Sequence, residues 1–276
     1  MADSVSPMPE SADADSALKC YMSVVRSLTA GLFRIWAAEA ASIRLRLACF
    51  EFNKAGRPGL DGPGAKSLQH IAKIPFDTFD AWSYVTDVSH LVYATTLLDT
   101  FLSDTTVFLF LLFPGSMGTN HQVPLRKILD LRSRNEVITQ AAMSRMREVS
   151  YLPFAARVQF LEQTFGLKIT LGAEEYDALN HYTSIRNAAV HDQGSFELSL
   201  DENGHPVSRR KTCLAHPTPM DVDDVSKAIK AYERVATAVA LAVCCQVLKQ
   251  PDHPLVKGLL RRAEGRPEDL PPKVGP

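Results

Sequence analysis

The stretch LNHYTSIRNAAVHDQGSF, residues 179–196, decides how the rest of this chain is interpreted. Its polar residues follow one another at spacings of four, three and four, so a helix places them on one narrow stripe. These residues are Asn180, Ser184, Asn187 and His191. Apolar residues with the same periodicity form the opposite stripe: Ala178, Tyr182, Ile185 and Ala189. The pattern predicts an amphipathic helix over about 173–191.

Arg186 projects beside the apolar stripe of this helix. An unpaired charge is costly to bury, so the guanidinium must reach either solvent or an acceptor. In one interpretation Arg186 pairs with Glu175 or Asp192, and His191 is a polar residue at the end of the helix dipole. In the other, Arg186, Asn187 and His191 converge on a phosphate. The guanidinium binds the phosphate, and the imidazole transfers a proton in the reaction.

Helical periodicity extends outward from this stretch in both directions, while one segment alternates like a hairpin. Helices are predicted over about 16–53 (one helix, or two joined near Gly31), 77–113, 124–149, 153–165 and 223–249. In the segment 195–215, Phe196, Leu198 and Leu200 alternate before a turn at Asn203-Gly204. The rings of Trp36 and Trp82 are expected in the core. The sequence therefore predicts an all-α fold with one small β-hairpin before the last long helix.

The expected organisation has four parts. Residues 1–15 are small and polar and are expected to be a disordered tail. A helical extension and loop follow over 16–64, where the breaker AGRPGLDGPG occupies 55–64. The main helical domain is expected over 65–250, and a Pro-rich, loose C-terminal tail over 251–276.

Composition excludes several classes of protein. The net charge of -1 argues against a globally cationic coat for nucleic acid, although the segment 123–170 is locally basic. The members of this basic region are Arg126, Lys127, Arg132, Arg134, Arg145, Arg147, Arg157 and Lys168, which form either a solvated face or a phosphate-attracting surface. Five cysteines without a Cys-x-x-Cys pair indicate a reducing, cytoplasmic setting. No signal peptide is expected, and the apolar run TVFLFLLF is too short to cross a membrane.

Other chemistry has no motif in this sequence. No His-x3-His pair or carboxylate cluster indicates a metal site, so no metal is expected. Histidines such as His70, His90 and His121 are isolated and are interpreted as surface residues. No glycine-rich phosphate loop or nucleophile elbow occurs, and no cofactor is expected.

The stretch "LNHYTSIRNAAVHDQGSF" resembles the signature of HEPN domains, in which an Arg, a polar residue and a later His end a core helix. Here these residues are Arg186, Asn187 and His191, which fit the family's Arg-x4-6-His spacing, and Gly194 follows. The order of helices over about 80–250 is similar to the RiboL-PSP-type HEPN group. The resemblance implies an up-and-down helical bundle, with the 16–53 helix and the hairpin as additions.

The resemblance further implies a homodimer that brings two Arg–His pairs into one cleft. Many members are metal-independent endoribonucleases, so Arg186, Asn187 and His191 would be catalytic, and Ser184, Asp192 and Gln193 would contact substrate. Five residues turn an ideal helix by about 500°, which leaves Arg186 and His191 about 140° apart, and a second subunit would complete the site. The implied function is cleavage of RNA to a 2′,3′-cyclic phosphate by a toxin or a stress- or phage-defence protein. The alternative is a non-catalytic HEPN dimer that binds a nucleotide, RNA or a regulatory partner protein, without a membrane role.

Overall fold

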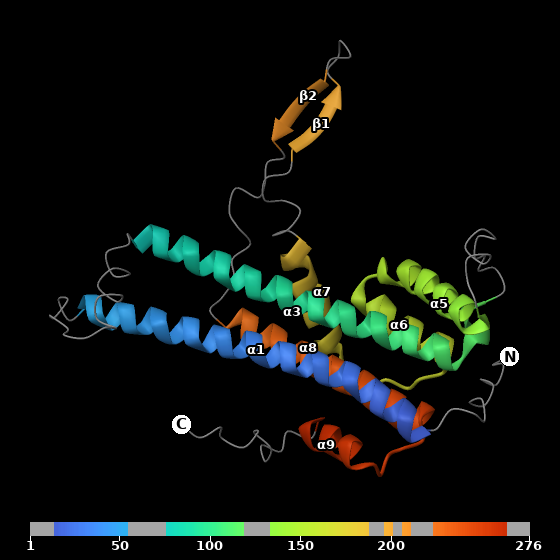
Figure 1. Ribbon diagram of the computed structural model, residues 1–276. Helices are drawn as coiled ribbons and strands as arrows, with labels where there is room; N and C mark the ends of the chain where they lie inside the picture. Colours follow the sequence, from blue (N-terminus) through green and yellow to red (C-terminus); the bar gives the residue numbers. More distant parts are fainter. Residues whose placement is uncertain are drawn as a thin grey trace. The chain divides into compact units, whose positions relative to one another are not determined.

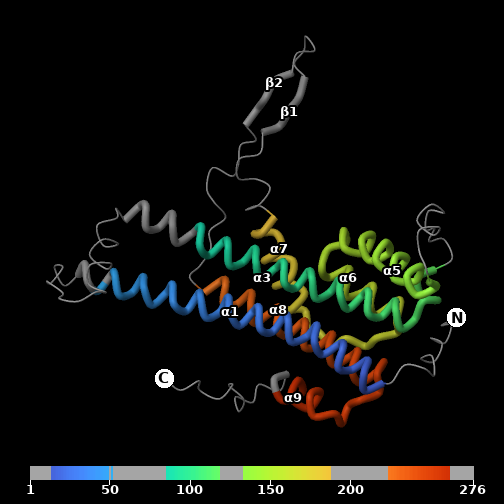
Figure 2. Tube along the Cα trace, in the orientation of Figure 1, coloured from blue at the N-terminus to red at the C-terminus, as the bar shows by residue number. Residues whose placement is uncertain are grey.

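The structure, a computed structural model, describes residues 14–54, 76–118, 133–187, 196–200, 206–210 and 223–263 (Figure 1). Figure 2 traces the Cα path in the same orientation. Within these ranges the chain is a helical bundle with one pair of short strands, and the predicted all-α class is confirmed (Figure 1). The long helices are α1 (Ala14–Lys54), α3 (Phe76–Leu112), α5 (Arg134–Ser150), α6 (Phe154–Phe165), α7 (Ala173–Asn187), α8 (Asp224–Ala242) and α9 (Pro254–Ala263).

Short elements extend two of these helices. The 3-10 turn Pro114–Met117 follows α3, and the π-helical turn Val243–Val247 continues α8. Strand β1 (Phe196–Leu200) pairs antiparallel with β2 (Pro206–Arg210), and Phe196 lies opposite Arg210. Helix α1 runs without a break through Gly31, which decides between the one-helix and two-helix alternatives for this segment.

Helix ends follow local chemistry. The Ser133 side chain accepts a hydrogen bond from the backbone N–H of Glu136 (3.2 Å) and caps the start of α5. Gly166 ends α6 with a φ of 67°, a left-handed conformation that a side chain would strain.

Helix α9 corrects the expectation of a loose tail over 251–276 for residues 254–263. Pro254 opens this helix because a proline lacks only an N–H that the first turn leaves without an intrahelical partner. Val256 and Leu259 are buried, so residues 254–263 are anchored by apolar contacts. A proline count alone does not separate a loose segment from one in which proline starts a helix.

The chain divides into two compact units, each built from separate segments. The first unit comprises Met1–Ala30, Thr96–Asn180 and Ala231–Pro276. In it, Tyr21 of α1 hydrogen-bonds Thr105 of α3 (3.3 Å) and stacks on Phe108. Phe110 of α3 contacts the ring of Phe165 from α6 edge-on, at 5.3 Å between centroids. The N-terminal helix thus supplies core residues and is part of this unit's apolar interior.

Two hydrogen bonds of one side-chain amide join distant segments of the first unit. The Gln246 Nε2 donates to the carbonyl of Lys168, and the N–H of Lys168 donates to Gln246 Oε1, both at 2.8 Å. Gln246 lies in the π-helical turn, where the N–H of Leu248 donates to the carbonyl of Val243 (3.0 Å), five residues earlier. These bonds tie the segment after α6 to the end of α8.

The second unit comprises Gly31–Thr95 and His181–Lys230. Its part of α1 carries a buried stripe at alternating spacings of four and three, the spacing of a helix seam. The members of this stripe from Leu32 onward are Leu32, Ile35, Glu39, Ser42 and Cys49, with Arg46 in register. Three of these six positions, Glu39, Ser42 and Arg46, are therefore occupied by a charged or hydroxyl side chain.

One expectation for α1 is wrong in this unit. Trp36, expected in the core, is 45% exposed, and Leu47 is 59% exposed. Both lie off the stripe that contains Ile35 and Glu39, because each residue along a helix is rotated by about 100°. After Ile35 the large apolar side chains Trp36 and Leu47 face solvent, whereas the buried stripe includes polar side chains.

The segment Val85–Leu112 of α3 is long and apolar enough to cross a membrane by length and composition alone. Several of its apolar side chains are buried inside the protein, among them Leu91, Leu98, Phe101 and Phe110. Burial in a protein core explains such a composition equally well.

Candidate functional site

The predicted catalytic residues Arg186 and Asn187 lie in the last turn of α7, in the second unit. The Arg186 Nη1 donates a hydrogen bond to Asn187 Oδ1 at 3.0 Å. Arg186 is half-buried, and its Nε is shielded from solvent without a hydrogen-bond partner among the described residues. Asn187 is exposed. The structure therefore brings two of the three proposed catalytic residues together, with the guanidinium held by an amide.

The other predicted site residues divide into two groups. Ser184 is exposed on α7, two residues before Arg186. His191, Asp192 and Gln193 lie outside the described residues.

The faces of α7 agree with the amphipathic pattern of the sequence. Leu179, Tyr182 and Ile185 are buried, whereas Asn180 and Ser184 are exposed. Burial raises the pKa of Tyr182, and the nearby carboxylate of Asp224 in α8 raises it further. The buried side chains fix the rotation of α7, so Asn187 is held on the solvent side.

One of the two ion pairs proposed for Arg186 does not form. Glu175 Oε1 accepts from Nη1 of Arg234 at 3.4 Å, and Glu175 Oε2 accepts from the N–H of Gly172 at 2.9 Å. The other proposed partner, Asp192, lies outside the described residues. Among the residues that the structure describes, Arg186 contacts no carboxylate, which favours its availability for an anion.

The basic region over 123–170 does not form one continuous cationic surface in its described part. Arg157 is 2% exposed and pairs with Asp99, and its Nη2 donates to Ser103 Oγ at 2.9 Å. Arg145 pairs with Glu148 on α5. Arg126, Lys127 and Arg132 lie outside the described residues. Arg157 is thus a structural cation, and for this residue the interpretation as a phosphate-attracting surface is wrong.

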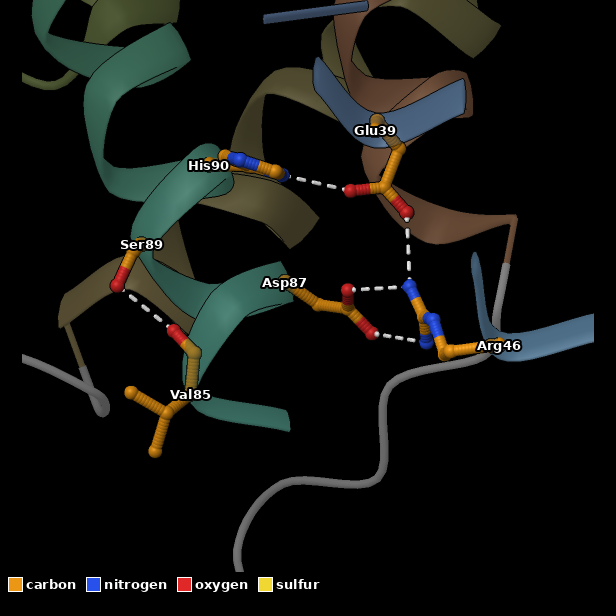
Figure 3. Close-up of polar contacts among 6 residues, drawn as sticks. All are labelled: Glu39, Arg46, Val85, Asp87, Ser89 and His90. Atoms are coloured by element: carbon orange, nitrogen blue, oxygen red, sulfur yellow. Dashed lines mark hydrogen bonds and ion pairs between the residues drawn. The ribbon is translucent and has the colours of Figure 1, made fainter. Parts of the chain in front are cut away.

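A polar cluster that sequence reasoning missed joins α1 and α3 in the second unit (Figure 3). Arg46 donates to both carboxylate oxygens of Asp87, from Nη2 at 2.9 Å and from Nη1 at 3.2 Å, and Nη2 also donates to Glu39 Oε1 at 3.2 Å. The other oxygen of Glu39 lies 2.6 Å from Nδ1 of His90. The four side chains form one chain of contacts, in which Glu39 is fully buried.

The electrostatics of this cluster follow from its burial. Burial raises the pKa of Asp87, and the two hydrogen bonds from Arg46 oppose that increase. The two carboxylates of Glu39 and Asp87 share the guanidinium of Arg46, and the imidazole of His90 contacts the remaining oxygen of Glu39. Because both carboxylates and the guanidinium are engaged with one another, the cluster holds α1 on α3 and leaves no free charge to bind a ligand.

The sequence did contain a signal for this cluster. Glu39 and Arg46 are seven residues apart, and both fall on the three–four stripe that begins with apolar residues. Asp87 and His90 stand at spacings of four from Leu91 and Ala94 in α3, which are buried. A charged residue on a core stripe indicates a buried partner, and His90, interpreted as isolated, is such a partner.

Neither a metal-binding group nor an activated thiol nucleophile occurs among the described residues. Within the described residues, no group of three His, Cys, Asp or Glu side chains is placed to hold a metal ion. Burial raises the pKa of the Cys244 thiol to about 12, so the thiolate that a nucleophile needs is scarce near neutral pH. Cys244 therefore acts as a small apolar residue of the core.

The candidate site is thus the exposed end of α7, where Arg186 and Asn187 meet. No protein-family model, no curated protein and no solved structure matches this chain.

Proposed function

We propose that this chain is a metal-independent endoribonuclease of the HEPN type, with Arg186, Asn187 and His191 as catalytic residues. The observation that carries the proposal is the state of Arg186. Its guanidinium contacts an amide and no carboxylate in the described part of the chain. A guanidinium that contacts no carboxylate, at a half-exposed helix end, is suited to bind a phosphate. The phosphate oxygens accept hydrogen bonds from two nitrogens of the guanidinium.

The reaction is an internal transfer of the phosphodiester. The 2′-oxygen attacks phosphorus while its proton passes to a base, the bond from phosphorus to the 5′-oxygen breaks, and that oxygen receives a proton. His191 serves as the base or as the acid, and Arg186 stabilises the negative charge of the crowded phosphate. Asn187 holds the guanidinium in place. The products are a 2′,3′-cyclic phosphate end and a 5′-hydroxyl end.

The proposed active species is a homodimer in the cytoplasm, of the toxin or stress- or phage-defence type. Each pocket takes Arg186 from one subunit and His191 from the other, since an ideal helix directs these two residues about 140° apart. Ser184, Asp192 and Gln193 contact RNA around the pair. A partner protein regulates access, and neither a cofactor nor a membrane takes part.

Cleavage in the presence of a chelator tests the proposal. Purified protein is incubated with mixed RNA in EDTA, beside His191→Ala and Arg186→Ala. We expect a loss of about 10²–10⁴-fold for His191→Ala, the usual contribution of a general acid or base. His181→Ala and Arg147→Ala are matched controls because both residues are exposed and in the described structure pair with no acid. Equal cleavage by all five proteins contradicts the proposal and favours the non-catalytic RNA- or partner-binding module.

Subunit mixing tests the composite site separately. The Arg186→Ala and His191→Ala proteins, each inactive alone, are unfolded together and refolded as a mixture. A heterodimer then contains one pocket with both residues, so activity returns if each pocket draws on two subunits. Continued inactivity of a verified heterodimer shows that the site lies within one subunit.

A further inference from the structure

The outward face of α1 in the second unit is unusual for a helix exposed to water. Phe33 is 51% exposed and Trp36 45% exposed, and their ring centroids lie 5.9 Å apart. Leu47, 59% exposed, lies further along the same helix. Between Trp36 and Leu47 three of the exposed positions are alanines: Ala37, Ala38 and Ala41. Large apolar side chains are rarely gathered on a surface without a binding role.

Arginines lie on the same face as these rings. Arg34 and Arg44 are exposed, and neither makes an ion pair with any described residue. On an ideal helix the positions from Trp36 to Arg34 span an arc of about 160°, and Arg44 falls near its centre. We call the set Phe33, Arg34, Trp36, Arg44 and Leu47 the α1 face.

An exposed carboxylate opposes the charge of the α1 face only beyond its far end, where Glu51 follows Leu47 by four residues. Between residues 16 and 50 the only acidic residue is Glu39, which is fully buried and bound to Arg46 and His90 (Figure 3). Arg46 is the one arginine of this segment that the buried carboxylates neutralise. The polar cluster therefore buries the one acidic side chain between Phe33 and Leu47 and leaves Arg34 and Arg44 on the surface.

We propose that the α1 face binds single-stranded RNA, with bases stacked on Phe33 and Trp36 and backbone phosphates held by Arg34 and Arg44. Exposed rings beside arginines are the combination that binds single strands without reading sequence. This inference rests on the proposed function, for which it names a substrate-holding surface separate from the end of α7.

Two features favour a nucleic acid over an anionic membrane. Both cations of the α1 face, Arg34 and Arg44, are arginines, whose planar guanidinium stacks on bases and binds phosphate with two nitrogens. Anionic lipid attracts Lys and Arg about equally. A helix that lies in a membrane surface also separates its rings from its cations, whereas here Arg44 lies among the apolar residues.

Binding of a fluorescent 20-residue single-stranded uridine RNA tests the inference. The full chain is used in EDTA with His191→Ala present throughout, so that the RNA stays intact. We expect the Kd to rise about 10-fold or more when Phe33→Ala and Trp36→Ala are combined, the usual effect of losing stacking on two rings. Arg34→Gln with Arg44→Gln should weaken binding and reduce its salt dependence. The control is Tyr151→Ala, which removes an 89% exposed ring in the first unit.

Each outcome decides the inference. Loss of binding in the face variants but not in Tyr151→Ala supports it. Equal binding by all variants overturns it, and so does an absence of RNA binding by the parent protein. If the face variants bind RNA normally but no longer bind phosphatidylserine vesicles, the inference is overturned and the face is a membrane-binding surface. If the face variants bind RNA normally but no longer self-associate, the inference is overturned and the face binds a second copy of the chain. A chain that binds RNA through the α1 face and never cleaves it supports the inference while the nuclease proposal fails.

Discussion

Two arginines, one in each unit, show how the surroundings of a guanidinium determine its role. Arg157 is 2% exposed, pairs with Asp99, donates to Ser103 and lies over the ring of Phe154, 5.5 Å from its centroid. Arg186 is half-buried and contacts the amide of Asn187. A guanidinium surrounded by a carboxylate, a hydroxyl and a ring is committed to the fold, and one held by an amide is still able to bind an anion.

The largest effect is expected where the committed arginine loses its carboxylate. Asp99→Ala leaves the buried guanidinium of Arg157 without its counter-ion and should lower the free energy of unfolding by about 3 kcal/mol. Urea denaturation measures the change, and Asp177→Ala, an exposed carboxylate of α7, is the control that should be neutral. If Asp99→Ala is also neutral, the pairing of Arg157 does not stabilise the fold, and the contrast with Arg186 is lost.

A smaller loss is expected from the polar cluster between α1 and α3. Glu39→Ala removes a fully buried carboxylate that contacts Arg46 and His90, but Arg46 keeps Asp87, so we expect a loss of about 2 kcal/mol. Glu51→Ala on the exposed side of the same helix should change stability little. Thermal and urea unfolding that rank the two variants the other way would contradict the structural role of the cluster.

The geometry of the same cluster predicts a still smaller effect for a substitution that keeps the charge. Arg46→Lys replaces two bonds to Asp87 by a single point contact and should cost about 1 kcal/mol. Arg44→Lys, at an exposed arginine, should be silent in the same unfolding experiment. Equal stability of both variants would mean that charge alone, without the two-pronged geometry, holds α1 on α3.

The smallest effect on stability is expected at Arg186, and it sharpens the comparison most. Arg186→Gln removes one bond to an amide at a helix end and should change the free energy of unfolding by at most about 0.5 kcal/mol. The same variant should lose RNA cleavage. A loss of stability as large as that of Asp99→Ala would instead place Arg186 among the structural arginines.

Periodicity was enough to predict the helices, because amphipathic spacing is a local property. Helices α1, α3, α6 and α7 begin within about three residues of the expected positions. Helix α9 was missed because its apolar residues Val256 and Leu259 stand in a short segment rich in proline. Such a segment is helical only when a core is present to bury these side chains.

Burial of the rings and charges was harder to predict than the helices themselves. Trp36 was assigned to the core because aromatic residues usually bury, yet Glu39, three residues later, is the buried one. Hydrophobicity alone favours the opposite assignment. Glu39 is buried because Arg46 and His90 supply donors at its two oxygens, and His90 comes from another helix.

The sequence by itself determined the helical class, most helix positions and the polar and apolar faces of α7, because each depends on residues within one or two turns of one another. It also brought Arg186 next to Asn187, since adjacent positions at a helix end need no distant contact. Only the tertiary structure decided which arginine is neutralised, because a carboxylate such as Asp99 or Asp87 lies more than forty residues away along the chain from its cation. Such pairs form only when packing brings two helices together, and the spacing of residues along one helix does not contain that information.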